Sequence, residues 1–277
     1  MFAIGPAGRE ASQLSPLIKS TARSALDAVY GTYVVVAFLV LGLSALAWVT
    51  LVPGLSVGVR RSIAHLAARL FFLVVGVRVR VVGKEHLPDG PCVVVANHAS
   101  YIDGVLLKAF LPARFSFVIK KEITKVPLAG LLLRRIGSEF VDRFNRNAGA
   151  MDTRRLIKAA DAGQAFAFFP EGTFNATPGV GKFHSGAFLI AARAGMPVIP
   201  VAIRGTRHML PGGRILPRYQ RLRIDILPAV LPPSEGRGSA SAQALRDEAR
   251  ARILATVDEP DLSDSDGVAG LVARRPV

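Results

Sequence analysis

The chain has 277 residues, with 35 Lys and Arg against 20 Asp and Glu, and therefore a formal net charge of +15. Hydrophobic residues make up 51% of it, which excludes a mainly disordered protein, and its single cysteine excludes an internal disulfide framework. No Cys/His cluster has the spacing of zinc ligands. A mean hydropathy of +0.37 beside this positive charge indicates a chain that is partly in a membrane and otherwise faces anionic headgroups or phosphorylated substrates.

A long uncharged stretch lies near the N-terminus. Between Asp27 and Arg60 there is no charged side chain, and the centre of this stretch, 33–52, has roughly the 20 apolar residues that a helix needs to cross a bilayer. Trp48 lies towards its end, where interfacial aromatics are common, and Pro53 breaks the helical pattern. Two other interpretations stay open, a cleaved signal peptide and a buried core helix.

A second apolar segment follows at 62–77 and carries His65 and Arg69. It fits either a helix lying in the membrane interface or the second half of a helical hairpin. We therefore expect a membrane-embedded helix or hairpin over 28–77, after an N-terminal segment at 1–27. Basic residues cluster on the C-terminal side of the long stretch, and this bias favours a cytoplasmic C-terminal domain.

From residue 78 onward, short apolar runs alternate with helical patterns. This alternation predicts an α/β domain over 78–231, with a mixed, mainly parallel central sheet flanked by helices. The expected strands are 78–83, 92–96, 115–119, 138–142, 165–169, 198–203 and 221–227, and the expected helices are 103–110, 127–135, 151–162, 185–195 and 239–257. A linker and C-terminal helix at 232–257 and a disordered acidic tail at 258–277 are expected to complete the chain.

The first motif that carries chemistry is Ala-Asn-His-Ala-Ser-Tyr-Ile-Asp-Gly at 96–104, where a strand ends and a helix begins. A turn between them can bring the His98 imidazole to the Asp103 carboxylate, which would fix the tautomer of the ring and raise its basicity. Such a pair can take a proton from an alcohol that attacks a carbonyl. An alternative stays open: Ser100 and Asp103 also fit a helix capping box, which would leave His98 as an ordinary loop residue.

Further candidates follow three other strands. Phe-Pro-Glu-Gly-Thr at 169–173 would present Glu171, Gly172 and Thr173 at the carboxyl edge of the sheet, where ligands gather in open α/β folds, or it is an ordinary turn. Lys120 and Arg143 also stand at strand ends, where they would suit a phosphate group or else be solvated surface residues.

Taken together, these residues resemble the glycerolipid acyltransferase family, which includes 1-acylglycerol-3-phosphate acyltransferase. His98 and Asp103 match its H-x4-D motif, and the segments 120–122, 137–143, 169–173 and 198–201 are similar to the blocks that follow in the same order. The resemblance implies that the fold holds an N-terminal helical element in the membrane leaflet. Together with the positive-inside bias, this element leads us to expect a membrane-bound protein with its catalytic domain on the cytoplasmic face, as at a bacterial inner membrane.

The resemblance further implies a reaction. His98, oriented by Asp103, would deprotonate the free hydroxyl of a lysophospholipid, most simply 1-acylglycerol-3-phosphate, and the oxygen would attack the thioester of acyl-CoA or acyl carrier protein. Lys120 and Arg143 would bind the acceptor's phosphate, while residues 171–173 would position its glycerol hydroxyl or complete the pocket. Anionic membrane lipids are expected partners; nucleic acid, metal ions and redox cofactors are not.

One position departs from the family pattern. In the members that form phosphatidate, an arginine commonly follows Phe-Pro-Glu-Gly-Thr, whereas Phe174 stands here. Loss of that charge-assisted contact weakens the case for a bare phosphomonoester and raises the case for another lysophospholipid or a lyso-aminolipid, unless Lys182 or His184 compensates.

Two rival classes account for fewer of these observations. Gly-Leu-Ser-Val-Gly at 54–58 matches the nucleophile elbow of serine hydrolases, with Ser56 as nucleophile, but an elbow should follow a strand and not a membrane-length run. A basic, membrane-tethered binding module would suit the charge but leaves the ordered motifs unexplained.

Overall fold

The computed structural model describes residues 6–142, 146–174, 177–233 and 237–263. Its centre is a seven-stranded sheet in the order β1-β7-β6-β2-β5-β3-β4. The strands are β1 (Val79–Val82), β2 (Val93–Ala96), β3 (Ser116–Lys120), β4 (Glu139–Val141), β5 (Phe166–Phe168), β6 (Val198–Arg204) and β7 (Leu222–Ile226). All neighbours run parallel except β6 and β7, so the predicted mixed, mainly parallel α/β fold is confirmed.

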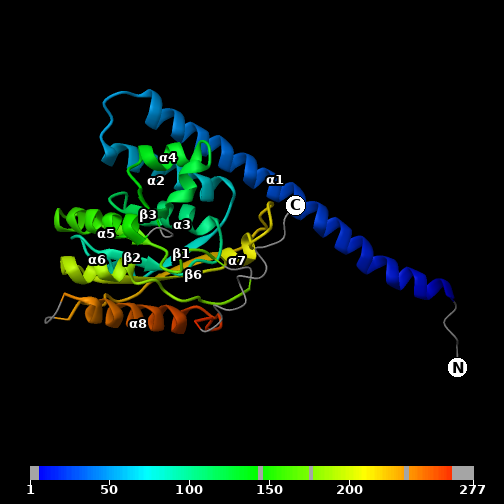
Figure 1. Cartoon of the computed structure of the whole chain (residues 1–277). Coiled ribbons are helices and arrows are strands. Elements are labelled where there is room, and N and C mark those ends of the chain that lie inside the picture. Colours follow the sequence, from blue (N-terminus) through cyan, green and yellow to red (C-terminus); the bar gives the residue numbers. More distant parts are fainter. Residues whose placement is uncertain (1–5, 143–145, 175–176, 234–236, 264–277) are drawn as a thin grey trace.

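Helices cover both faces of this sheet (Figure 1). They are α1 (Pro6–Leu51), α2 (Val57–Val74), α3 (Ile102–Phe110), α4 (Ala129–Arg135), α5 (Arg146–Asp161), α6 (Gly186–Ala194), α7 (Thr206–Met209) and α8 (Ser239–Thr256), with short 3₁₀ turns at Lys84–His86 and Lys121–Lys125. Buried residues of α1, α2 and α3 share one core with the sheet, and those of α5, α6 and α8 share the other.

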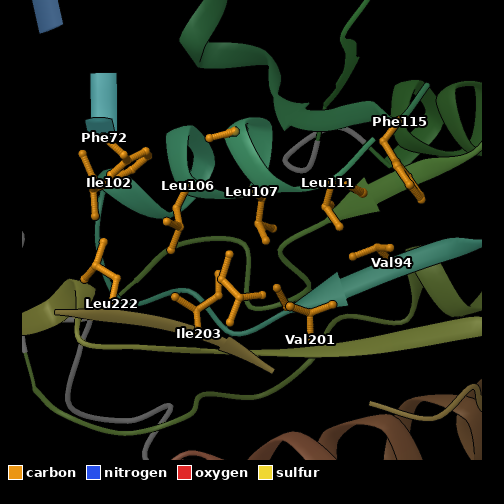
Figure 2. Close-up of a cluster of buried hydrophobic side chains, with 14 of the residues drawn as sticks. Phe72, Val94, Ile102, Leu106, Leu107, Leu111, Phe115, Val201, Ile203 and Leu222 are labelled. Atoms are coloured by element: carbon orange, nitrogen blue, oxygen red, sulfur yellow. The ribbon is translucent and has the colours of Figure 1, made fainter. Parts of the chain in front are cut away.

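The two cores follow from the alternation of side chains along each strand. In β2, Val94 belongs to the core beneath α3, while Val93 and Val95 belong to the core beneath α6 and α8. Figure 2 shows the first core, in which Leu106 and Leu107 of α3 lie over strand residues such as Val94. A strand that is apolar on both faces is expected in a sheet covered on both sides.

The N-terminal helices are part of the first core. Helix α1 begins at Pro6, so residues expected as a separate N-terminal segment continue the helix; proline is tolerated at a first helical position because its missing N–H is not needed there. The Tyr30 and Tyr33 hydroxyls donate to the carbonyls of Val75 and Val74 at 3.1 and 2.8 Å and tie α1 to the end of α2. Figure 1 shows α1 running across the domain and then well beyond it.

Within the described chain, one helix is long and apolar enough to cross a membrane: Arg23–Leu51, with a mean hydropathy of 2.5. About a quarter of its apolar window, 28%, is buried inside the protein. Val34 and Val49, 1% and 0% exposed, face the protein, while Val36 and Leu39 are more than half exposed. The outer face of this helix therefore offers a continuous apolar surface.

The C-terminal region differs from the expectation. Helix α8 packs on the sheet through the buried Leu245 and Ile253, so it belongs to the α/β core. Residues 258–263 do not form the start of a disordered tail, because Glu259 pairs with Arg207 at 2.9 Å and Asp261 pairs with Arg250 at 2.5 Å. The expectation of disorder followed the acidic composition, which these two arginines offset. Residues 264–277 lie outside the described chain.

Candidate active site

The candidate residues converge on one edge of the sheet. Strands β2, β5 and β3 are parallel neighbours, so their carboxyl ends lie side by side. His98 follows β2, Glu171 follows β5, and Lys120 ends β3. Strand order thus brings together segments that are far apart in the chain, at the edge where ligands bind in open α/β sheets.

The His98 and Asp103 side chains form a hydrogen-bonded pair. The Nδ1 of His98 donates to Oδ2 of Asp103 at 2.9 Å. The Asp103 side chain is fully buried, whereas that of His98 is 18% exposed. Because Nδ1 is engaged by a carboxylate, Nε2 is the ring nitrogen available for proton transfer.

The same carboxylate also holds the turn before α3. Oδ2 of Asp103 accepts the backbone N–H groups of Ala99 and Ser100 at 2.7 and 2.8 Å. The bond from Ser100 N–H is the one that Asp103 would accept in a capping box, but α3 begins at Ile102 and the Ser100 hydroxyl accepts the Ile102 N–H at 3.3 Å, so the reciprocal bond to Asp103 N–H is not made. The Asp103 carboxylate thus holds the turn and also bonds the imidazole.

Asn97, which the sequence did not single out, and Ser100 anchor this turn. The Asn97 side chain donates to the Ile203 carbonyl at 3.0 Å and accepts the Ile203 N–H at 2.7 Å, which extends the pairing of β2 with β6 by one residue. The Ser100 hydroxyl donates to the Leu210 carbonyl at 2.7 Å. The sequence did contain a signal for this role of Asn97: it directly follows a strand, and its side-chain amide can pair with a neighbouring strand as a peptide group does.

The Glu171 carboxylate accepts hydrogen bonds from two backbone N–H groups. Its Oε1 accepts the His98 N–H at 2.7 Å, and its Oε2 accepts the Gly181 N–H at 2.8 Å. Desolvation by burial raises the pKa of this carboxyl to about 7, although both N–H donors and the nearby His98 oppose the shift. The sequence predicted that Glu171 positions the acceptor's glycerol hydroxyl or completes the pocket. In the structure both of its oxygens bind backbone, and these bonds hold His98 and the loop that contains Gly181.

The raised pKa predicts a pH-dependent contribution to stability. Since the folded state favours the protonated Glu171 carboxyl, its contribution is present below the ordinary value of 4.5 and is lost as the pH rises towards about 7. The loss amounts to at most roughly 3 kcal/mol. Thermal unfolding of the parent and of Glu171→Gln at pH 5 and pH 7.5 should show the parent losing stability relative to the variant. Parallel pH profiles would contradict the assignment.

Aromatic rings enclose the imidazole. Phe169 stacks on the His98 ring with centroids 4.3 Å apart, and Phe174 meets it edge-on at 4.9 Å. Tyr101 in turn packs against Phe174 at 4.6 Å. Phe174 thus occupies space beside the imidazole with an apolar ring.

A cavity of about 620 Å³ opens at His98 and reaches between the helices. Phe38, Ala45, Ala64, Ala68 and Leu133 are among the residues of α1, α2 and α4 that line it. Small side chains on two packed helices leave space that larger ones would fill. The resulting hollow is of the size and apolar character that suit a small hydrophobic ligand.

Lys120, Gly172 and Thr173 line the same cavity, so three of the predicted binding residues share it with His98. Arg143 lies outside the described residues. Lys182 and His184 are not among the lining residues, and the His184 backbone N–H donates to the Pro170 carbonyl at 2.8 Å.

Lys108 adds a cation inside the cavity. Its Nζ lies 5.7 Å from the centre of the Phe117 ring. Burial, together with the nearby Arg61 charge, lowers the pKa of its amine to about 8. Among the described residues, no group of three or more His, Cys, Asp or Glu is placed to hold a metal ion.

Comparison with known proteins gives this arrangement a family. The family model described as Acyltransferase matches residues 78–204. The fold is similar to the crystal structure of the 1-acyl-sn-glycerophosphate acyltransferase PlsC from Thermotoga maritima, with a TM-score of 0.66. The two sequences are 26% identical, and the match covers 93% of this chain and 99% of that one. The chain belongs to the glycerolipid acyltransferase family. The resemblance seen in the sequence motifs is thereby confirmed.

The similar proteins are named for different acceptor lipids. The chain is 29% identical over 205 residues to a chloroplastic 1-acyl-sn-glycerol-3-phosphate acyltransferase of Brassica napus, covering 72% of this chain and 57% of that protein. It is 35% identical over 180 residues to a lyso-ornithine lipid O-acyltransferase of Pseudomonas aeruginosa, covering 62% and 66%. The chain spans just over half the length of the plastid relatives.

Ser56 does not have the setting of a hydrolase nucleophile. It lies between two helices, where it is the N-cap of α2 and its hydroxyl accepts the Val59 N–H at 3.3 Å. A nucleophile elbow needs a strand before the serine. Ser56 is therefore a helix cap in this fold and not a nucleophile of the elbow type.

Proposed function

We propose that the protein transfers a fatty acyl group from acyl-CoA or acyl carrier protein to the free hydroxyl of a lysophospholipid. The observation that carries this proposal is the His98–Asp103 pair at the opening of a cavity lined by apolar helices. A general base next to a cavity that can hold a hydrocarbon chain suits a reaction in which a hydroxyl group accepts a fatty acyl group. The first acceptor to consider is 1-acylglycerol-3-phosphate, which would give phosphatidic acid.

The proposed steps use the chain's own residues. His98 Nε2 takes the proton of the acceptor hydroxyl while the oxygen attacks the thioester carbonyl. Asp103 stabilises the imidazolium that forms, through the 2.9 Å bond to Nδ1. The tetrahedral intermediate then expels the thiol sulfur, which takes the proton back from His98. The acyl chain passes directly from sulfur to oxygen, with no acyl-enzyme.

Binding of the acceptor is assigned to the sheet edge. Lys120, which lines the cavity at the end of β3, and Arg143, which follows β4 in the sequence, are proposed to hold the acceptor's phosphate. Gly172 and Thr173 would face its glycerol. Glu171 is proposed to act on the acceptor only through the position of His98, because both of its oxygens bind backbone.

Phe174 favours a second acceptor class. An apolar ring 4.9 Å from the His98 ring gives a phosphomonoester no partner at that point. An acceptor with a different headgroup, such as another lysophospholipid or a lyso-aminolipid, would lose less there. The 35% identity to a lyso-ornithine lipid O-acyltransferase supports testing that class beside 1-acylglycerol-3-phosphate.

Membrane attachment is proposed through α1 and α2, with the α/β domain on the cytoplasmic face. Their outer residues support it, since Leu39, Trp48 and Leu73 are 51%, 62% and 74% exposed. Exposed apolar area on this scale is typical of surfaces that meet lipid.

The test is thiol release from long-chain acyl-CoA by the purified chain in detergent, with and without each lysolipid. Release that depends on an acceptor supports the proposal, and the headgroup that gives the highest kcat/KM names the acceptor. Release without any acceptor would indicate a thioesterase and contradict the transferase. Ser56→Ala should keep full activity, because Ser56 only caps α2.

For Arg143→Ala, we expect KM for a phosphorylated acceptor to rise roughly tenfold while kcat changes little, because the lost contact is mainly a binding one. Steady-state kinetics with the phosphorylated acceptor measure both constants. An unchanged KM would remove Arg143 from the acceptor site.

A further inference from the structure

The segment between α7 and β7, residues 211–221, borders the cavity on one side and solvent on the other. Gly212 and Gly213 line the cavity, as Tyr101 and Phe174 do. Two residues further on, Ile215 is 82% exposed. This segment therefore forms part of the cavity wall and also reaches the protein surface.

The segment is held against α1. Arg218 pairs with Asp27 at 3.2 Å, and the Tyr219 ring meets the Tyr30 ring with centroids 6.0 Å apart. At Gly31, an added Cβ would lie 2.8 Å from the Leu216 side chain, so only glycine allows this approach. Figure 1 shows the yellow segment after α7 reaching up to α1. Its orientation is set by these contacts.

Exposed apolar residues continue from this segment on to the helices. Leu26 and Val29 of α1 are each 70% exposed, and Leu73 at the end of α2 is 74% exposed. The bonds of Tyr30 and Tyr33 to the end of α2 join these parts in one place. We call Leu26, Val29, Leu73 and Ile215 the apolar rim. A single exposed isoleucine is ordinary, whereas several exposed apolar residues on elements that contact one another indicate an interaction surface.

The charge of the segment identifies what this surface meets. Residues 211–221 contain Arg214, Arg218 and Arg221 and no acidic residue. Arg214 donates to the Leu216 carbonyl at 2.8 Å and Arg218 pairs with Asp27, while the Arg218 and Arg221 side chains are exposed. An exposed isoleucine on such a basic segment matches a lipid interface, in which the apolar side chain enters the boundary of headgroups and acyl chains and exposed basic groups face phosphates. The rim is also continuous with α1, the helix that is apolar enough to enter a membrane.

We propose that residues 211–221 form a second membrane contact, which seats the cavity opening on an anionic bilayer through Ile215 and its neighbouring arginines. The acceptor then passes from the leaflet to His98 between Gly212–Gly213 and the Tyr101–Phe174 pair. This passage rests on the proposed function, whereas the membrane contact does not. The proposal assigns Ile215 a place in the bilayer when the full chain is membrane-bound.

The contact can be measured without any activity assay. Cys92 is fully buried and burial raises the pKa of its thiol to about 11, so a cysteine introduced at the surface will be labelled selectively. Ile215→Cys carries an environment-sensitive fluorophore, and the full chain is reconstituted in vesicles of phosphatidylcholine and phosphatidylglycerol. The control is Leu231→Cys, at a residue 70% exposed between β7 and α8.

We expect the label at 215 to shift to the blue, to be quenched by brominated lipid, and to be protected from aqueous iodide, while the label at 231 stays in water. Removing phosphatidylglycerol should weaken the shift. A label at 215 that iodide quenches as readily as the label at 231 would overturn the proposal.

A second arm tests the passage of the acceptor. For Ile215→Asp, the rate on lysolipid in vesicles, divided by the rate on a monomeric short-chain lysolipid, should fall roughly tenfold. The ratio should not change for Leu231→Asp, and an unchanged ratio for Ile215→Asp would overturn the passage. If the label at 215 enters the bilayer and the parent transfers no acyl group, the contact stands and the proposed function fails.

Discussion

Replacing His98 with alanine is expected to lower kcat for acyl transfer by about 10²- to 10⁴-fold, the usual contribution of a positioned general base. KM for the acceptor should change little, because the lost interaction is made mainly in the transition state. Asp103→Asn should lose a comparable part of kcat, since a neutral amide does not stabilise the imidazolium and accepts its three donors less well.

His208→Ala is the matched control, because His208 is an exposed histidine on α7 and should keep the parent kcat. The measurement is steady-state release of thiol from acyl-CoA at saturating acceptor. Retention of more than about a tenth of the parent kcat in His98→Ala would contradict the assignment of His98 as general base. Circular dichroism and thermal unfolding of each variant separate loss of chemistry from loss of fold.

Phe72→Ala should lower the free energy of unfolding by about 3–5 kcal/mol, the range for a large buried aromatic replaced by alanine. Phe72 is 2% exposed and packs against Phe71 and Phe110 with ring centroids 5.0 and 5.9 Å apart. In Figure 2 it lies beside Ile102, at the start of the helix that carries Asp103. The thermal midpoint should fall by roughly 10 °C in a fixed detergent.

Leu73→Ala provides the comparison, because Leu73 follows directly in α2 and is 74% exposed. Its midpoint should stay within about 2 °C of the parent. Equal effects of the two substitutions would mean that α2 is not part of the folded core. The same packing predicts that a chain lacking residues 1–77 fails to fold, since Val34, Phe71 and Phe72 leave the core with them.

Local sequence was sufficient for the strands and for the His98–Asp103 pair. Short apolar runs predicted the seven strands to within one residue at each end, because most of these strands are buried on both faces of the sheet. Helix α5 begins five residues before the expected helix, and the short α7 was not expected. His98 and Asp103 are five residues apart, so a single turn brings them together, and the same turn explains the capping pattern at Ser100. The ordered structure of residues 258–263 could not be predicted from their own sequence, since the partners of Glu259 and Asp261, Arg207 and Arg250, lie in other elements.

The α/β class, the family motifs and the apolar N-terminal stretch could be predicted from the sequence, because each of these depends on residues that are close together in the chain. The positions of Glu171, Phe169 and Phe174 around His98 depend on long-range contacts. Strand β5 pairs with β2, and this pairing brings the Glu171 carboxylate into hydrogen-bond contact with the His98 N–H, although the two residues are 73 positions apart in the chain. Likewise, the apolar cavity exists only where α1, α2 and α4 meet over β3. Such contacts follow from strand order and helix packing, which are set by the burial of two whole cores and not by any short segment.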